Sequence, residues 1–259
     1  MALLLVWLCR HRCCTNISWL ALLLAGERSE EEQLGYTENV ARWVHVGLLA
    51  LPLYGVLTLW TTFIHQPDPN ADFEAYARYV STTNYLVDHL FGSNLGVMLA
   101  IFGAVALGIY LSSRRSALVG MVTSVAGNIL ILTIFGMSTF ATPAVGRAYL
   151  EGQRNIIEVN QDILGVPVIV TALLGGLLYS TGTILFGVAV WRSATLPKWA
   201  GVLYAPTGLL ISILGLMIGQ AQTVGSLLII IGGGWIAWSV VRRPPTEPVE
   251  PAARPSRVS

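Results

Sequence analysis

Six long apolar segments make up most of this chain. They cover residues 41–64, 90–112, 117–140, 163–191, 199–219 and 224–241. A helix needs about 20 consecutive, mostly apolar residues to cross a bilayer. Only 11% of the residues are charged, whereas soluble domains carry about 25%. The chain therefore has too little polar surface for a water-soluble globule. The sequence predicts an all-α polytopic membrane bundle of six transmembrane helices.

Small residues recur every fourth position along the second segment, at Gly92, Gly96, Ala100, Ala104 and Gly108. On a helix this spacing forms one nearly continuous ridge. Because lipid provides little hydrophobic drive between helices, close backbone approach along such a ridge is a main source of association. We expect this helix to be central to the bundle. Packing within the chain is favoured over a homodimer seam, although a homo-oligomer stays open; a second ridge contains Ala172, Gly176 and Ser180.

Residues 1–40 are predicted to form an extension that is disordered or lies at the membrane interface. Its apolar runs, Met1–Leu8 and Ile17–Gly26, are too short to span. Acidic residues at positions 27 and 30–32 suit a solvated linker. A translation start assigned too far upstream is the alternative explanation. At the other end, the proline-rich residues 242–259 predict a disordered tail.

Two short surface helices are expected between the spans. Phe73, Tyr76, Ala77 and Val80 form one apolar face of an amphipathic helix, and Glu74 can pair with Arg78 across one turn. Thr142-Pro143 suits the start of a second such helix, which Gly152 would end, with a polar loop over residues 153–162. Prolines within or near the ends of spans predict kinks, at Pro52, Pro167 and Pro206.

The distribution of arginine and lysine predicts the orientation in the membrane. The turns after the second and fourth spans and the end of the last span contain Arg114, Arg115, Arg192, Lys198, Arg242 and Arg243. The opposite loops contain only three arginines, Arg78, Arg147 and Arg154, together with half of the 14 acidic residues. By the positive-inside rule, both termini are cytoplasmic. We expect a multi-pass protein of the bacterial cytoplasmic membrane.

A weak candidate metal site on the predicted outer side contains His65, His89 and Asp162, with Asp88 and Glu158 nearby. Histidine and carboxylate ligands suit zinc. No ligand pair has the spacing of a single-helix site, however, and polar groups at helix ends ordinarily meet water, which is the favoured explanation. The group Cys9, His11, Cys13 and Cys14 has no second ligand set to close a zinc-bound loop, so no metal is predicted there.

Four polar residues are candidates for lining a cavity between the helices: Tyr54, Thr58, Asn94 and Asn128. Asn128 lies deepest, and a hydrogen bond between helices is its more ordinary role. His45 is expected to pack with its ring near the headgroups rather than to sense protons.

Several function classes lack their usual residues. A net charge of +1 with no basic block gives no indication of a nucleic-acid partner, and no acidic or basic residue lies deep in a span, as ion-coupled pumps require. No phosphate-binding loop, nucleophile elbow or cofactor motif is present. A non-enzymatic accessory, sensor or lipid-binding component is therefore favoured. The alternatives are a facilitator for a small neutral or apolar solute and an outer-face metal-dependent enzyme.

From Ala41 onward the chain resembles a group of uncharacterised bacterial multi-pass membrane proteins with a domain of unknown function. The resemblance rests on three short stretches, Ala41-Arg42-Trp43 with Leu51–Gly55, Leu90–Ser93 and Gly146–Leu150. It implies a six-helix bacterial membrane protein and assigns no activity, cofactor or site residue.

Overall fold

The computed structural model describes residues 30–242, with side chains from residue 39 onward. Every regular element in this part of the chain is helical. Six stretches are long and apolar enough to cross a membrane: Asn39–Thr61, Thr83–Tyr110, Arg115–Leu150, Ile156–Trp191, Lys198–Met217 and Gly219–Val241. The predicted six-span helical architecture is therefore confirmed. Contacts divide the chain into two compact units, residues 1–43 and 44–259, and the bundle belongs to the second.

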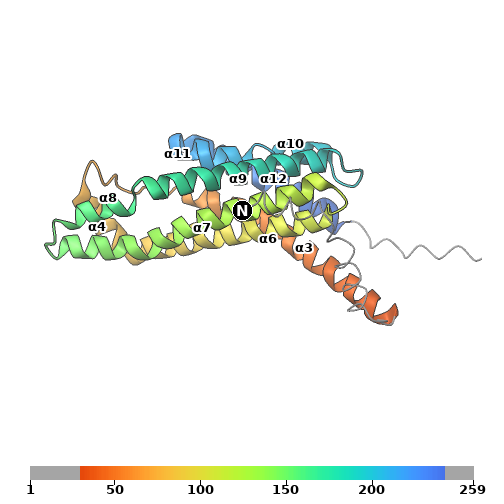
Figure 1. Cartoon of the computed structure of the whole chain (residues 1–259), viewed down its shortest axis with the longest axis horizontal. Helices are drawn as coiled ribbons and strands as arrows, with labels where there is room; N and C mark the ends of the chain where they lie inside the picture. Colours follow the sequence, from red (N-terminus) through yellow and green to blue (C-terminus); the bar gives the residue numbers. More distant parts are fainter. Residues whose placement is uncertain (1–29, 243–259) are drawn as a thin grey trace, which may run out of the picture. The chain divides into compact units, whose positions relative to one another are not determined.

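The longer helices are α3 (Glu30–Thr61), α6 (Gly96–Tyr110), α7 (Arg115–Leu150), α9 (Val166–Trp191) and α12 (Gly219–Val241). The shorter helices are α4 (Phe73–Val80), α5 (Thr83–Val87), α8 (Ile156–Ile163), α10 (Lys198–Tyr204) and α11 (Gly215–Met217). Two segments are π-helical, η1 (Asp88–Leu95) and η2 (Leu209–Leu214). Each π segment continues directly into an α-helix, η1 into α6 and η2 into α11, both labelled in Figure 1. Thus η1 lies inside the second span and η2 inside the fifth.

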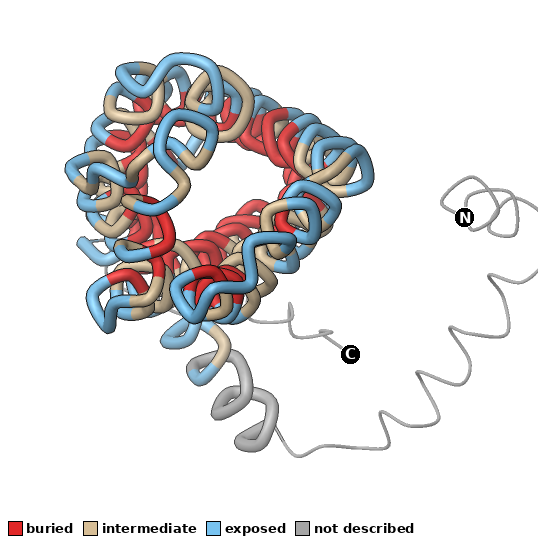
Figure 2. The backbone as a smooth tube through the Cα atoms, turned by 90° about the vertical axis from the view of Figure 1, so that its left-hand side faces the viewer, coloured by how far each residue is buried: buried red, intermediate tan, exposed pale blue. Residues whose placement is uncertain are grey.

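Within the second unit the six spans form a closed ring in the order α3, α6, α7, α9, α10 and α12. Glycines allow neighbouring helices to approach closely. Gly47 of α3 faces Ala106 of α6, and Gly120 of α7 faces the α9 backbone. Gly233 of α12 faces Leu51 of α3, and this contact closes the ring. Figure 2 shows buried residues on the inner side of this ring and exposed residues on its outer side. The outer residues are largely apolar, as lipid requires, and include Phe102, Val122, Leu177 and Ile231.

One half of the bundle is densely filled with side chains. We call it the packed half; it adjoins the turns at residues 111–114 and 192–197. Its fully buried side chains come from five of the spans and include Leu48, Leu51, Leu107, Phe186, Tyr204, Ile229, Ile236 and Val240. We call the other half, toward residues 62–72 and the break at Ile218, the open half. Over residues 129–138, 166–174 and 209–220 of the open half, no residue is buried.

α4 packs against the far end of α7, beyond the ring. The Asp72 side chain caps α4 by accepting a hydrogen bond from the Ala75 amide at 3.0 Å. Gly146 of α7 allows the approach, since a methyl group there would lie 2.6 Å from a Val80 methyl carbon. The predicted apolar face is confirmed, as Tyr76 and Val80 form a core with Tyr85. Burial, followed by the charge of neighbouring Tyr85, raises the pKa of Tyr76 to about 12.

The predicted break at Thr142-Pro143 is wrong. α7 continues through Pro143 to Leu150, so no separate surface helix begins there. Pro143 removes one backbone donor, but it is buried, as are Thr142 and Gly146 around it. Packing against α4 therefore outweighs the local preference of proline to start a helix. Gly152 ends the helix as predicted, with a φ of +100° that favours glycine.

Other boundaries also differ from the sequence prediction. The polar stretch predicted to be a loop forms α8 over Ile156–Ile163, and the acidic linker expected at residues 30–32 is helical, because α3 begins at Glu30. α5 begins at Thr83, so Asp88 and His89 lie inside a helical span instead of at its start. The predictions for residues 1–29, including the cysteine group, and for residues 243–259 lie outside the described residues.

The predicted ridge of α6 divides between two neighbours. Gly92 and Gly96 face Thr61 and Tyr54 of α3, whereas Gly108 faces Met121 of α7. In a regular α-helix each four-residue step advances the position by about 40° around the axis, so Gly108 lies about 120° from Gly96 and faces a different helix. In the second ridge Gly176 and Ser180 pack within the chain against Ser212, as expected, whereas Ala172 is not buried.

Candidate functional site

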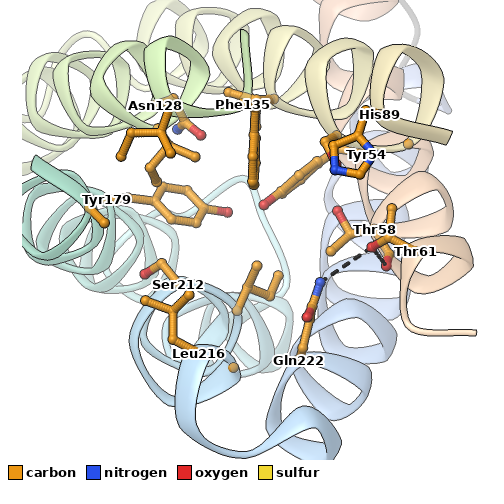
Figure 3. Close-up of a pocket in the computed structure, with 18 of the residues that line it drawn as sticks. Tyr54, Thr58, Thr61, His89, Asn128, Phe135, Tyr179, Ser212, Leu216 and Gln222 are labelled. Carbon is orange, nitrogen blue, oxygen red and sulfur yellow. Dashed lines mark hydrogen bonds between the residues drawn. The ribbon is translucent and has the colours of Figure 1, made fainter. Parts of the chain in front are cut away.

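The open half contains a cavity of about 330 Å³. This volume far exceeds the roughly 10–15 Å³ that one water molecule requires and lies within the range of ligand pockets, about 300–1,000 Å³. All six spans contribute to its wall (Figure 3). A cavity of this size inside a membrane-type bundle is the strongest candidate for a functional site.

Irregular helix geometry positions much of this wall. His89, Gly92 and Ser93 come from η1, and Ile211 and Ser212 come from η2. A π turn contains an additional residue and widens the helix, and such turns are frequent at functional sites. Both π segments therefore lie beside the cavity, while the packed half is built from regular α-helix.

The closed end of the cavity contains two buried polar atoms without a hydrogen-bond partner, Asn128 Oδ1 and the Tyr179 hydroxyl. The Asn128 Nδ2 donates to Ser124 O of its own helix at 2.8 Å, so the interhelical hydrogen bond expected for Asn128 is not formed. The Tyr179 ring lies edge-on to Tyr54, with centroids 6.5 Å apart. Since a buried polar group without a partner is costly, each atom would gain from a hydrogen bond to a group placed against it.

A polar wall extends from this closed end toward the mouth. It contains Thr58 and Thr61 of α3 and Gln222 of α12, whose Nε2 donates to Thr61 Oγ1 at 3.3 Å (Figure 3). In Figure 3 His89 lies on the same side of the cavity as Thr58 and Thr61, and its Nδ1 is 3.1 Å from Tyr85 O. A carbonyl oxygen only accepts, so Nδ1 carries the proton and donates. In the neutral ring Nε2 is left as an acceptor.

An apolar wall faces the polar one. Ile131, Ile134 and Phe135 of α7 form it together with Ala172 of α9 and Leu216 of α11. Among the lining residues, Asp88 and His89 are the ionisable groups at the mouth, and neither lysine nor arginine is present. The cavity is thus amphipathic, with hydrogen-bonding groups on one side and hydrocarbon on the other.

Three of the four residues predicted to line a cavity do so: Tyr54, Thr58 and Asn128. The fourth, Asn94, instead ties η1 to α7, because its Nδ2 donates to His89 O at 2.9 Å and to Thr139 Oγ1 at 2.7 Å. His45 is half-buried and does not line the cavity.

The candidate metal ligands do not gather. Within residues 30–242, no three His, Cys, Asp or Glu side chains lie close enough together to hold a metal ion. His65 and Asp162 are exposed, and only His89, with Asp88, reaches the cavity. The structure therefore does not assemble the site that an outer-face metal enzyme requires from these residues.

Sequence reasoning missed Tyr179, Ser212 and Gln222. Tyr179 is the one tyrosine in an uncharged span over Val166–Trp191, which is a usable signal. The sequence prediction places Gln222 in a connecting loop, whereas α12 begins three residues earlier at Gly219. Comparison of the chain with protein-family models, curated proteins and solved structures finds no match.

Proposed function

We propose that this protein binds a small, neutral, amphipathic molecule in the cavity of its open half, as a non-enzymatic ligand-binding or lipid-binding membrane component. The observation that carries the proposal is the pair of partnerless polar atoms at the closed end, Asn128 Oδ1 and the Tyr179 hydroxyl. Oδ1 can only accept a hydrogen bond, whereas a tyrosine hydroxyl both donates and accepts. A ligand hydroxyl or amide group complements both.

The surrounding residues support a neutral ligand. Among the described residues that line the cavity there is no lysine or arginine to neutralise a phosphate or carboxylate, and an unpaired charge buried in an apolar site is very costly. The apolar wall formed by Ile131, Ile134 and Phe135 suits a hydrocarbon body. The ligand class is therefore an uncharged molecule with one hydrogen-bonding end, such as an alcohol or an amide.

Saturable photolabelling tests this binding. The full chain in lipid nanodiscs is labelled with a diazirine derivative of 1-pentanol, and labelled peptides are identified by mass spectrometry. We expect saturable labelling around Asn128 and Tyr179. Tyr179→Phe should weaken binding about five-fold, since one hydrogen bond contributes about 1 kcal/mol. Its thermal stability should be unchanged or raised, because the removed hydroxyl has no partner in the protein.

Tyr204→Phe is the matched control, because it makes the same change at a fully buried tyrosine of the packed half. It should leave labelling unchanged. Labelling that is not saturable, or that Tyr179→Phe leaves unaltered, would contradict the proposal.

Facilitated passage of a small neutral solute is the second candidate. The cavity extends from Gln66 and His89 at its mouth to Asn128 in mid-span, which is one half of a transmembrane path. The packed half would have to open to complete it. Glycerol permeability of proteoliposomes separates the two functions, since a binding protein leaves it equal to that of protein-free vesicles.

The positive-inside rule further supports an orientation with the packed half toward the cytoplasm of a bacterial cell and the cavity mouth facing outward. Single cysteines introduced at Asn70 and Ala194, which are both exposed, test it in a chain whose three natural cysteines are replaced. An impermeant maleimide added to intact cells should label Asn70→Cys and should label Ala194→Cys only after lysis. Labelling of both from the same side would overturn the six-span topology itself.

A further inference from the structure

The close contact between α7 and α9 ends partway along the two helices. It is made at Gly127 and Gly175: a methyl group at Gly127 would lie 2.5 Å from Tyr179 N, and one at Gly175 would lie 3.1 Å from Gly127 O. Toward the open half no residue is buried on α7 over 129–138 or on α9 over 166–174. In Figure 1 the two ribbons separate in this direction, toward α8.

Helical spacing identifies the residues that continue the contacting faces of the two helices beyond this contact. Ile134 follows Gly127 by seven residues, or about two turns, and so lies on the same side of α7. It lines the cavity and is not buried against α9. Val168 precedes Gly175 by seven residues and is also not buried. The stretch of wall between α7 and α9 beyond this contact therefore contains no buried side chain, which suits a lateral opening of the cavity there.

Such a lateral opening would differ chemically from the axial mouth. Its rim would consist of apolar side chains that line the cavity, Ile134 and Phe135 of α7 and Ala172 of α9. The surface beside it is also apolar and exposed, at Ile169, Val170 and Leu173. The axial mouth instead carries Gln66, Asp88, His89 and Gln222. An apolar rim within an apolar surface faces lipid, whereas the polar mouth faces water.

We propose that the ligand is a lipid-like amphipath that reaches the cavity sideways from the bilayer, between α7 and α9 above Gly127 and Gly175. This inference rests on the proposed ligand-binding function and specifies its ligand class. The polar end of the ligand lies against Asn128 and Tyr179, and its hydrocarbon chain leaves through the lateral opening into the adjoining leaflet. A cavity of about 330 Å³ accommodates the polar end and the first carbons of such a molecule, while lipid solvates the remainder of its chain.

Two photolabels of different chain length test the route. Full-length protein in lipid nanodiscs is labelled with diazirine derivatives of 1-hexadecanol and of 1-pentanol. The long alcohol reaches the protein from lipid, and the short one also from water through the axial mouth. Ala172→Trp places a bulky side chain on the rim of the opening. We expect it to abolish labelling of the Tyr179 peptide by the long alcohol and to retain labelling by the short one.

Leu173→Trp is the matched control, since Leu173 is the next residue along α9 and is exposed to the outside of the ring. It should retain labelling by both alcohols. If Ala172→Trp does not fold, Ile134→Trp is used in its place, because it obstructs the opening from the side of α7.

The outcomes separate the two proposals. If the wild-type protein shows no saturable labelling by either alcohol, the ligand-binding function itself is wrong. Retained labelling by the long alcohol in both rim variants, or equal loss of labelling by both alcohols, would overturn the lateral route alone.

Discussion

Replacing Gly127 by alanine should destabilise the protein by at least about 2–3 kcal/mol, the upper part of the range for overpacked sites. The added methyl group would lie 2.5 Å from Tyr179 N and 2.6 Å from Gly175 O. Both are backbone atoms, which cannot move aside as the end of a flexible side chain can. α7 and α9 would have to separate along their closest contact. Thermal unfolding in detergent micelles, followed by size-exclusion chromatography, measures the loss.

Gly136→Ala is the control for this substitution, because Gly136 lies on the same helix and a methyl group there meets no atom within 4 Å. It should leave stability unchanged or raise it by up to about 1 kcal/mol, since glycine is less favourable than alanine within a helix. Equal melting temperatures for the two variants would show that α7 and α9 do not meet at Gly127.

Replacing Phe186 by alanine should have a comparably large effect, about 2–3 kcal/mol. Phe186 is fully buried in the packed half and contacts the Tyr204 ring edge-on, with centroids 6.3 Å apart. Its removal leaves a void and loses dispersion contacts. We place the cost below the roughly 3–5 kcal/mol typical of soluble proteins, because an unfolded span in lipid keeps its side chains in hydrocarbon.

Phe135→Ala makes the same change in the open half, where Phe135 already lines the cavity. Because one side of its ring has few neighbours, the cost should stay within about 1 kcal/mol. The same unfolding measurement compares the two variants. A similar loss of stability in both would contradict the division of the bundle into a packed and an open half.

The spans were predictable because a segment that crosses a membrane needs a certain length and an apolar composition, whichever way the helices pack. Several helix contacts were predictable for a related reason, as only small residues permit close approach. The break at Thr142-Pro143 was misjudged because a local signal cannot show that α4 packs against α7 there. Likewise α8 forms from a stretch whose composition is typical of a loop.

The candidate site was predicted only in part. Tyr54, Thr58 and Asn128 were recognisable as polar residues in apolar spans, and all three line the cavity. The cavity itself depends on the π segments η1 and η2 and on the divergence of α7 from α9, which leave no periodic trace in the sequence. In regular, tightly packed helices the same polar residues would have formed hydrogen bonds within the protein instead of lining a cavity. Asn94 illustrates this, since its amide joins two helices.

The length of α7 means that one helix is stabilised in two different environments. Its 36 residues extend about 54 Å at about 1.5 Å per residue, well beyond a hydrocarbon core of about 30 Å. Its first turns meet α9 through glycine, as association in lipid favours. Its last turns meet α4 through Phe73, Tyr76 and Val80, large side chains whose burial is favourable only against water. We therefore expect the projecting end of α7 to lie in water, and solutes that weaken hydrophobic burial, such as urea, should release α4 before they separate the spans.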